Sequence, residues 1–380
     1  MKKKILLFSM TFPPMVIGTA NYARVLAEGL HDWGFDVAVL APNARMASEC
    51  DSNLPFSVKR VDYPSFVPLK YFVARKALKE MVVSFNPDCV WATNGMAARV
   101  AGLVRFWDKT PLICTMHGSD VTVRLQSRIE SIPQARAYRQ ATAVGSVSEY
   151  ILRRAHESNV YPAKTFIHSP TFDSSNFINH RYDQERFYSL YPQLRGKTII
   201  LSVARLVTQK RIHHSLSAFS NLASEFYDIC YLIVGDGNQR GNLEDQAHRL
   251  GCAERVVFTG AQDPASEGLL DCYSAATIFF LPSIREGLPT VFSEAGSMGL
   301  PVLSVKDGGV PEIVEDGITG LLAQRDDVED MTRKLRLFLN NKHDVERMGA
   351  AGRKRVEQLF SRELFNRRAT DILRHILGDC

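Results

Sequence analysis

Residues Pro282–Ala295 read PSIREGLPTVFSEA and follow an apolar run at Ile278–Leu281. A short, continuous apolar run is typical of a strand that is buried on both faces of a sheet. The loop after it carries Glu286 and Gly287, and Pro289 suits the first turn of a helix, where a missing N–H costs nothing. The stretch therefore predicts a strand, a loop and a helix of an α/β fold.

The expected helix start is also a candidate binding site. Its backbone N–H groups and the positive end of its dipole favour a phosphate group. Glu286 lies just before this start, and Glu294 lies about one and a half turns into the helix. Because carboxylates repel phosphate, we expect these two to flank a bound group and to accept hydrogen bonds from sugar hydroxyls. The alternative is an acidic bias at a helix start together with a surface glutamate.

Short apolar runs alternate with helical patterns on both sides of this stretch. In the second half, strands are predicted at Lys197–Val203, Cys230–Val234, Val256–Phe258 and Pro301–Ser304, with helices at His213–Glu225 and Leu243–Leu250. In the first half, strands are predicted at Lys4–Ser9, Phe35–Ala41, Asp88–Ala92, Pro111–Met116 and Ala141–Ser146, with helices at Gly18–Trp33, at Ala97–Phe106 and from Ser148. Buried strands separated by helices predict parallel sheets that are covered on both faces.

The alternation weakens over Tyr161–Gly196, which we interpret as the connection between two domains. We expect Rossmann-like domains at 1–190 and 191–360. Two such domains in tandem would face each other across a deep cleft at the carboxyl ends of their strands, where open α/β sheets bind ligands.

Composition excludes several classes of protein. The chain has 380 residues, of which 45% are hydrophobic and 23% charged, as in an ordinary globular protein rather than a disordered or fibrous one. No apolar run approaches the roughly 18–20 residues that span a bilayer. The apolar start is too short for a signal peptide and ends at Phe12-Pro13-Pro14. Seven cysteines without a Cys-x-x-Cys pair indicate free thiols in a reducing cytoplasm.

Charge is distributed unevenly along the chain. Residues 1–200 hold 25 Lys and Arg against 16 Asp and Glu, whereas residues 201–380 hold 21 against 25. A basic half beside an acidic half indicates that the first domain meets something anionic, such as a membrane surface, an acidic acceptor or nucleic acid. Scattered solvated charge is the alternative.

Further candidate residues follow the predicted strands of the second half. Arg205 and Lys210 come after Lys197–Val203, and a guanidinium with an ammonium suits a diphosphate. A solvated basic turn is the alternative. Gly308-Gly309 allows the backbone to approach a ligand closely, or forms a tight turn. Val234–Gly237 resembles the start of a dinucleotide fingerprint, but the third glycine, Gly241, comes one residue late.

In the first half, Gly18 lies at the expected start of the helix that follows Phe12-Pro13-Pro14. His117 and Asp120 follow the predicted strand Pro111–Met116 and therefore lie at the same sheet edge. A lone histidine after a strand is more often structural than catalytic. The position of His117 at the same edge as the other candidate residues makes the odds of the two roles more nearly equal.

In this order, the motifs resemble those of a family 4 glycosyltransferase with the two-domain GT-B fold. The matching pieces are Phe12-Pro13-Pro14 with Gly18, His117–Asp120, Ala204-Arg205-Leu206 with Lys210, Val234–Gly237, Glu286-x7-Glu294, and Gly308-Gly309 with Glu312. They cover nearly the whole chain. Two pieces depart from the family pattern: Ile17-Gly18-Thr19 replaces a glycine pair, and Ser169–Asp173 replaces Asn-Gly-Val-Asp.

The resemblance implies a role for each matching residue. Arg205 and Lys210 would hold the donor diphosphate and stabilise the leaving group, Glu286 would hold the donor sugar, and Glu294 the ribose. His117 would lie beside the transferred sugar. The implied catalytic residues are Glu286, His117, Arg205 and Lys210. The implied donor-binding residues are Gly18, Arg205, Lys210, Glu286, Gly287, Leu288, Pro289, Thr290 and Glu294, and the acceptor-binding residues are His117 and Asp120.

The resemblance also implies the reaction. A sugar would move from a UDP- or GDP-sugar to a glycan, a lipid-linked acceptor or another small acceptor, with retention of configuration, in the biosynthesis of cell-envelope polysaccharide or glycoconjugate. No metal, no cofactor and no nucleic acid partner is expected. The enzyme would be cytoplasmic and would work at the inner face of the membrane. Basic amphipathic stretches at Tyr71–Met81 and Val121–Arg139 fit such a contact, and solvated helix faces are the alternative. A C-terminal helix within 361–380 would pack back on the first domain.

Three alternatives stay open. One is a GT-B nucleotide-sugar epimerase or hydrolase, although we cannot place the additional acid–base carboxylates that it would need. A second is an inactive homologue that binds nucleotide sugar, which the presence of Glu286, Arg205 and Lys210 disfavours. A third is a dehydrogenase, which the misplaced Gly241 disfavours.

Overall fold

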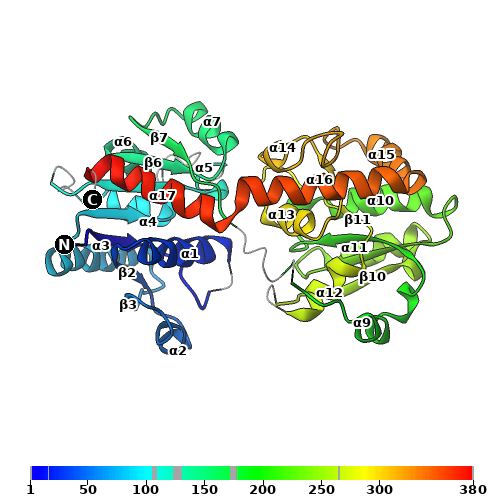
Figure 1. Ribbon diagram of the computed structural model, residues 1–380, viewed down its shortest axis with the longest axis horizontal. Helices are drawn as coiled ribbons and strands as arrows, with labels where there is room; N and C mark the ends of the chain where they lie inside the picture. Colours follow the sequence, from blue (N-terminus) through cyan, green and yellow to red (C-terminus); the bar gives the residue numbers. More distant parts are fainter. Residues whose placement is uncertain are drawn as a thin grey trace. The chain divides into compact units, whose positions relative to one another are not determined.

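The computed structural model describes residues 2–15, 17–104, 109–122, 131–171, 177, 179–263 and 266–378. The chain forms two compact units (Figure 1). Unit 1 comprises Met1–Thr171 and Arg362–Cys380, and unit 2 comprises Phe172–Ser361. Among the described residues, no helix is both long and apolar enough to cross a bilayer.

Unit 1 is built on a sheet of seven parallel strands. In spatial order they are β3 (Ser57–Val61), β2 (Asp36–Pro42), β1 (Lys4–Phe8), β4 (Cys89–Ala92), β5 (Leu112–Met116), β6 (Ala143–Ser146) and β7 (Thr165–Ile167). The helices are α1 (Gly18–Asp32), α2 (Ala47–Asp51), α3 (Val67–Phe85), α4 (Gly95–Ala101), α5 (Gly118–Thr122), α6 (Ser131–Gln140), α7 (Glu149–Glu157) and α17 (Arg362–Leu377). In the register, Leu6 of β1 pairs with Ala38 on one side and Val90 on the other.

Unit 2 repeats this plan with six parallel strands. In spatial order they are β10 (Val256–Gly260), β9 (Ile229–Val234), β8 (Thr198–Val203), β11 (Ile278–Phe280), β12 (Val302–Val305) and β13 (Gly320–Ala323). The helices are α9 (Gln184–Leu190), α10 (Ile212–Ala223), α11 (Arg240–Arg249), α12 (Glu267–Ala275), α13 (Thr290–Ser297), α14 (Val310–Ile313), α15 (Val328–Asn340) and α16 (Lys342–Phe360). Among the described residues of this unit, 3₁₀ turns lie at Pro192–Leu194, Thr208–Lys210 and Ala253–Arg255.

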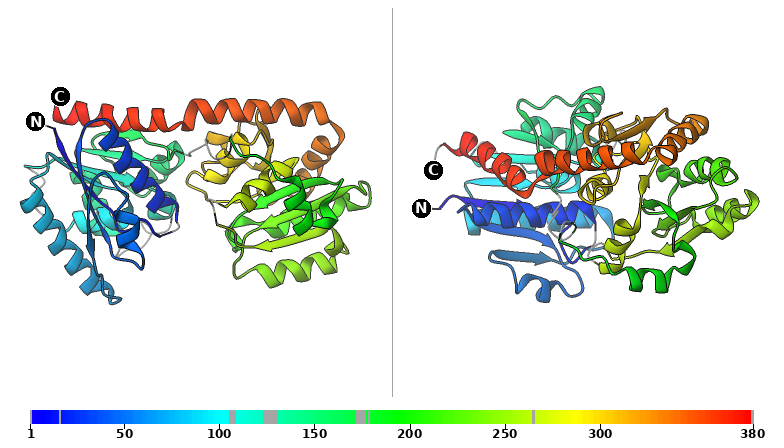
Figure 2. Two further views of the ribbon diagram at one scale, coloured as in Figure 1. Left: turned by 60° about the horizontal axis from the view of Figure 1, so that its bottom comes forward. Right: turned by 45° about the vertical axis from the view of Figure 1, so that its right-hand side comes forward.

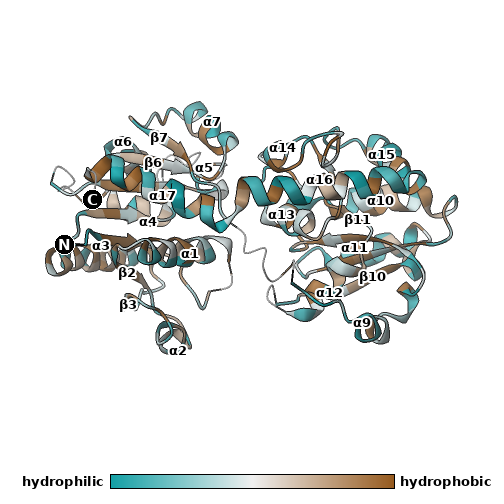
Figure 3. Cartoon of the chain, viewed as in Figure 1, coloured by the Kyte–Doolittle hydropathy of each residue, from teal (hydrophilic) through white to brown (hydrophobic). Residues whose placement is uncertain are grey.

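Both sheets have the strand order of a Rossmann fold, which confirms the predicted α/β class. Every residue of β4, β5, β6, β9 and β11 is buried, as expected for parallel strands with helices on both faces. Figure 3 shows the apolar character of the strands in unit 2. The strand order reverses between β1 and β4 and again between β8 and β11. Open α/β sheets bind ligands at such reversal points, beyond the carboxyl ends of the strands.

Polar side chains fix where several helices begin. Asn94 accepts a hydrogen bond from the N–H of Ala97 at the start of α4, and Ser148 accepts one from Ile151 at the start of α7. Ser266 does the same for Leu269 at the start of α12. Each side chain satisfies an N–H that has no partner within its helix.

The boundary between the units lies at 171/172 rather than at the predicted 190/191. The reason is that α9 packs on α12: the Arg186 guanidinium donates to Asp271 Oδ2 from Nε at 2.8 Å and from Nη2 at 2.6 Å. The predicted connection therefore contains a helix that belongs to unit 2. Of the departure at Ser169–Asp173, Phe172 and Asp173 lie outside the described residues.

The C-terminal helix α17 belongs to unit 1 and packs against α1 (Figure 2). Phe365 and Leu373 of α17 are buried in the same apolar core as Tyr22 and Leu26 of α1. The second predicted boundary, at 360/361, thus lies one residue from the division at 361/362.

Candidate functional site

The carboxyl edge of the unit 2 sheet holds a pocket of about 240 Å³. It lies where β8, β9 and β10 end and α13 begins. Its apolar lining comes from Val203, Ala204, Val234, Gly235, Ala261, Leu269 and Val291, and its polar lining from Arg205, Asp236, Gln262 and Glu294. Two of the predicted donor-binding residues, Arg205 and Glu294, therefore line one pocket. The Arg205 side chain is exposed, and within the described part of the chain no side chain pairs with it.

The glycines after β9 shape the loop that carries Arg205. A Cβ atom on Gly235 would lie 1.8 Å from the carbonyl oxygen of Ala204, and one on Gly237 would lie 2.4 Å from that of Leu206. Gly235 and Gly237 have φ angles of 136° and 158°, and the N–H of Leu206 donates to the Asp236 carbonyl at 2.9 Å. These glycines permit close contact between two loops, which accounts for the pattern that resembles a dinucleotide fingerprint.

Glu294 is held by two hydroxyl groups. The phenol of Tyr273 donates to Glu294 Oε2 at 2.7 Å, and the hydroxyl of Thr290, one turn earlier in α13, also bonds to the carboxylate. Burial raises the pKa of Glu294 above its ordinary value, and the two hydrogen bonds oppose that rise. The carboxylate is thus oriented by neutral donors rather than by a cation.

Lys210 and Glu286 form an ion pair. Lys210 Nζ lies 2.6 Å from Glu286 Oε1, and each side chain is only 15% exposed. Backbone contacts hold the two loops together, because the N–H of Ile284 donates to the Gln209 carbonyl at 3.1 Å. The structure therefore brings Lys210 and Glu286, which were both predicted as site residues, next to each other. They bind each other directly, which the sequence did not reveal.

Gly308 and Gly309 lie directly under the loop of Glu286. The N–H of Gly309 donates to the Glu286 carbonyl at 2.9 Å. A Cβ atom on Gly309 would lie 2.0 Å from the carbonyl oxygen of Gly287, and one on Gly308 would lie 2.6 Å from that of Glu286. The close approach that this glycine pair allows is therefore to the loop that carries Glu286, and an approach to a ligand stays a prediction.

The helix start predicted near Pro289 is present, with one difference. Pro289 is the residue before α13 rather than part of its first turn, and its φ and ψ of −79° and 110° are extended. Thr290 is the first helical residue, Gly287 and Pro289 are buried, and Leu288 is half-buried. The N–H groups of a first helical turn have no partner inside the helix, so this turn suits an anion.

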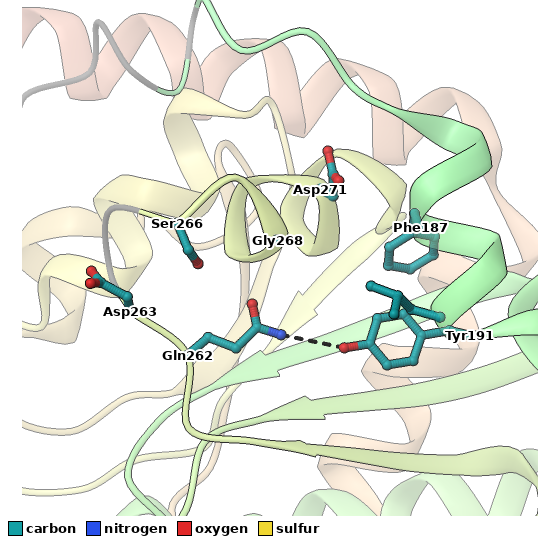
Figure 4. Close-up of a pocket in the computed structure, with 8 residues that line it drawn as sticks. Phe187, Tyr191, Gln262, Asp263, Ser266, Gly268 and Asp271 are labelled. Atoms are coloured by element: carbon teal, nitrogen blue, oxygen red, sulfur yellow. Dashed lines mark hydrogen bonds between the residues drawn. The ribbon is translucent and has the colours of Figure 1, made fainter.

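A second pocket, of about 350 Å³, has Gln262 in its lining (Figure 4). It is lined by Phe187, Leu190, Tyr191, Gln262, Asp263, Ser266, Gly268 and Asp271. Gln262 lines both pockets, and its Nε2 donates to the Tyr191 hydroxyl at 3.4 Å.

In unit 1, His117 and Asp120 are buried and engaged with the backbone. His117 Nε2 donates to the Thr93 carbonyl at 2.9 Å, and burial lowers the pKa of the ring, so it is neutral at pH 7. Asp120 Oδ2 accepts the N–H of Gly95 at 2.8 Å and that of His117 at 3.3 Å. This geometry gives Asp120 a structural task between α4 and α5, and its contact with an acceptor stays a prediction.

Gly18 is exposed as the first residue of α1. A Cβ atom on it would meet no described atom within 4 Å, so there is space in front of this helix start. Thr19 Oγ1, the next residue, lies 3.0 Å from Thr11 Oγ1. The donor-binding role implied for Gly18 stays a prediction.

A buried polar network in unit 1 was missed by the sequence analysis. The Tyr22 hydroxyl bonds to Thr115 Oγ1 at 3.2 Å and to His168 Nδ1 at 2.5 Å, and His168 Nε2 donates to the Phe365 carbonyl at 3.0 Å. Burial lowers the pKa of His168 to about 3. His168 follows the three-residue strand β7, which was not predicted, so no signal marked it as a core residue.

No group of three or more His, Cys, Asp or Glu side chains suited to a metal ion occurs within the described ranges. The candidate site is instead made of cationic side chains, two glutamates and a helix start. This chemistry suits an anionic ligand that also carries hydroxyl groups.

Two tandem Rossmann-like units, with a pocket at the reversal point of the second, are features of the GT-B fold. Sequence models of two glycosyltransferase families match the chain: "Glycosyl transferase 4-like domain" over residues 18–170 and "Glycosyl transferases group 1" over residues 191–355. The chain belongs to the family 4 glycosyltransferases. It is thus a glycosyltransferase, as predicted.

Two bacterial relatives span nearly the same length. A GDP-mannose-dependent monoacylated α-(1-6)-phosphatidylinositol monomannoside mannosyltransferase of Corynebacterium glutamicum is 27% identical, with 98% of each chain covered. The capsular polysaccharide biosynthesis glycosyltransferase CapM of Staphylococcus aureus is 23% identical, with 89% of each covered.

Solved structures share the fold. The Anabaena protein HepE in complex with UDP is similar with a TM-score of 0.81 at 16% identity, covering 98% of this chain and all of that one. A glycosyltransferase of Rickettsia africae has a TM-score of 0.82 at 17% identity, with 100% of both chains covered. These structures confirm the predicted GT-B fold.

Proposed function

We propose that this enzyme transfers a sugar from a UDP- or GDP-sugar, bound in unit 2, to a glycan, a glycolipid or another small acceptor of the cell envelope. We further propose that the transfer retains the anomeric configuration and needs no metal. The observation that carries the proposal is the 240 Å³ pocket lined by Arg205 and Glu294, beside the Lys210–Glu286 pair.

The pocket suits a nucleoside. Its apolar side chains offer a surface for a base, and a carboxylate is the natural acceptor for the two hydroxyls of a ribose. The curated relatives support a nucleotide donor, since one is named for its dependence on GDP-mannose, and the HepE structure contains UDP. The mannosyltransferase is named for a lipid-linked acceptor and CapM for the biosynthesis of capsular polysaccharide. We propose an acceptor of this kind for the present chain.

The cationic side chains suit the leaving diphosphate. The Arg205 guanidinium can bind phosphate oxygens through two parallel N–H groups. The Lys210 ammonium has three N–H groups, of which one donates to Glu286. With the N–H groups at the start of α13, these charges would stabilise the departing diphosphate as a divalent metal does in other transferases. This assignment is the basis on which we propose that no metal is needed.

Retention is proposed from the resemblance to family 4 glycosyltransferases, and the engagement of the carboxylates bears on how it would occur. Glu286 pairs with Lys210, and Glu294 is held by Tyr273 and Thr290, so neither is arranged as a nucleophile of the kind that a retaining glycosidase uses. His117 donates through Nε2 and is neutral, so that nitrogen cannot accept a proton. We assign the acceptor's proton to the leaving phosphate oxygen, as the resemblance to family 4 glycosyltransferases implies.

We also propose that unit 1 binds the inner face of the membrane through α3. From the N-cap residue of this helix onward, residues three or four apart on one face are exposed. They are apolar near its start, cationic in its middle and apolar again at Val83. They are Phe66, Leu69, Phe72, Lys76, Lys79 and Val83. Such a face suits an anionic bilayer. The second stretch predicted for this role, Val121–Arg139, includes residues 123–130, which lie outside the described ranges.

The reaction can be tested without knowledge of the acceptor. The purified protein is incubated with UDP-glucose or GDP-mannose in excess EDTA, and slow release of the free sugar is followed by NMR. We expect the first anomer released to match the donor, at a rate that EDTA leaves unchanged. The opposite anomer would contradict retention, and an absolute need for a divalent cation would contradict the role of Arg205 and Lys210. A sugar nucleotide with an inverted hydroxyl would identify an epimerase.

The membrane contact is tested by sedimentation with vesicles of phosphatidylglycerol and phosphatidylcholine. Replacing exposed Phe72 with Ser should release the protein from anionic vesicles, whereas Tyr227→Ser, at an exposed aromatic residue of unit 2, should not. Equal retention of both variants on the vesicles would contradict the role of α3.

A further inference from the structure

Tyr273 is a fully buried residue whose one polar atom reaches the nucleotide pocket indirectly. Its side chain is 0% exposed and does not line the pocket. Its hydroxyl donates to Glu294 Oε2 at 2.7 Å, and Glu294 does line the pocket. Within the described ranges, the hydroxyl has no other hydrogen-bond partner. A buried phenol usually finds a partner, and here that partner is the carboxylate assigned to the ligand.

The position of this hydroxyl is fixed by packing. The Tyr273 ring stacks on Phe279 with centroids 6.0 Å apart, and Phe177 contacts it edge-on at 5.7 Å. The helix that carries it is anchored two residues earlier, since buried Asp271 pairs with Arg186 and His180. Because neither the ring nor its helix is free to shift, the hydroxyl holds Glu294 Oε2 at one place.

The fixed hydroxyl of Tyr273 orients the Glu294 carboxylate before a ligand binds. A glutamate side chain has three rotatable bonds, and ordering them on ligand binding costs free energy. With the carboxylate already held by Tyr273 and Thr290, its remaining lone pairs point in fixed directions, and the two hydroxyls of a ribose can donate to them. A deoxyribose offers one hydroxyl and gains less from this arrangement.

We propose that Tyr273 is a positioning residue: it orients Glu294 toward the ribose and thereby sets the preference of unit 2 for ribonucleotides over deoxyribonucleotides. The inference rests on the proposed function, because it requires a nucleoside diphosphate in the pocket. Tyr273 itself does not touch the ligand, and its effect is exerted through Glu294 alone.

The test is the substitution Tyr273→Phe, which keeps the ring and its stacking and removes only the hydroxyl. Dissociation constants are measured by calorimetry for UDP, GDP and ADP and for their 2′-deoxy counterparts. For the nucleotide that the native protein binds, we expect a preference for ribose of at least about tenfold, equal to about 1.4 kcal/mol. In Tyr273→Phe we expect this preference to fall below about threefold, mostly through weaker binding of the ribonucleotide.

The matched control is Tyr231→Phe. Tyr231 is an equally buried tyrosine of β9 whose hydroxyl bonds to Ser202 and Ser215 at 2.7 Å each, away from the pocket lining. It should lose stability but keep the preference for ribose. An unchanged preference in Tyr273→Phe, or an equal loss in both variants, would overturn the role of Tyr273 alone. Native protein that binds none of the nucleotides, or that binds without preference, would overturn the donor site and this role with it.

Discussion

Replacing Gly309 with alanine should displace the loop of Glu286 without straining the backbone of residue 309 itself. Gly309 has φ and ψ of −85° and 5°, which alanine adopts freely. The added Cβ, however, would lie 2.0 Å from the carbonyl oxygen of Gly287. That oxygen must retreat by more than about 1 Å to reach van der Waals distance.

The retreat has two measurable costs. It stretches the 2.9 Å hydrogen bond from Gly309 N–H to the Glu286 carbonyl and moves Glu286 away from Lys210. Overpacking of this kind lowers the free energy of unfolding by about 1–3 kcal/mol. Because Glu286 is predicted to hold the donor sugar, displacing it by about 1 Å should lower turnover by on the order of 100-fold.

The assay is calorimetric titration with the sugar nucleotide and with its nucleoside diphosphate, together with thermal unfolding. We expect the affinity for the sugar nucleotide to fall by at least tenfold, and by more than the affinity for the nucleoside diphosphate. The control is Gly241→Ala in α11, where no atom lies within 4 Å of the added Cβ and where alanine stabilises the helix by up to about 1 kcal/mol. If Gly309→Ala binds and melts like the control, the account of this loop is wrong.

Three further predictions concern charged and titratable groups. Lys210→Met should leave Glu286 unpaired, lower the free energy of unfolding by about 2 kcal/mol and weaken nucleoside diphosphate binding tenfold or more. The double variant Lys210→Met with Glu286→Gln should regain stability in thermal unfolding but not affinity in calorimetric titration. Glu294→Gln should have a higher melting temperature than the native protein at pH 7.5. The raised pKa of Glu294 means that the native protein loses stability as the pH rises from the ordinary carboxyl pKa of 4.5 through the raised value. A lower melting temperature of the variant at pH 7.5 would contradict this. His168, with a pKa of about 3 when folded and 6.5 when unfolded, should cost the native protein on the order of 2 kcal/mol between pH 7.5 and 5, and chemical unfolding of His168→Gln should show a smaller loss.

The strand pattern was predictable wherever strands are buried on both faces. The runs at Lys4–Ser9, Cys230–Val234 and Pro301–Ser304 are strands within a residue or two, because a parallel strand covered by helices is apolar throughout. The edge strand β3, with the sequence SVKRV, was not predicted, since its exposed polar positions break the apolar run. β7 has only three residues and gives too little pattern to detect.

The candidate site was predictable in its members but not in its contacts. Arg205 and Glu294 were placed at one sheet edge because both follow predicted strands, and they do line one pocket. The Lys210–Glu286 ion pair joins residues 76 positions apart, and no local pattern encodes that distance. Tyr273 could not be found at all, because a tyrosine among apolar residues in a helix looks like any core residue.

The central claim is that unit 2 binds a nucleoside diphosphate through Glu294 without a metal. The most direct test is the melting temperature of the native protein and of Glu294→Gln in excess EDTA, with UDP, GDP, ADP, CMP or NAD. We predict that a nucleoside diphosphate at a hundred times its dissociation constant stabilises the native protein by about 2.7 kcal/mol and that the variant loses this stabilisation. Stabilisation by NAD alone, by none of the nucleotides, or equally in both proteins would contradict the claim.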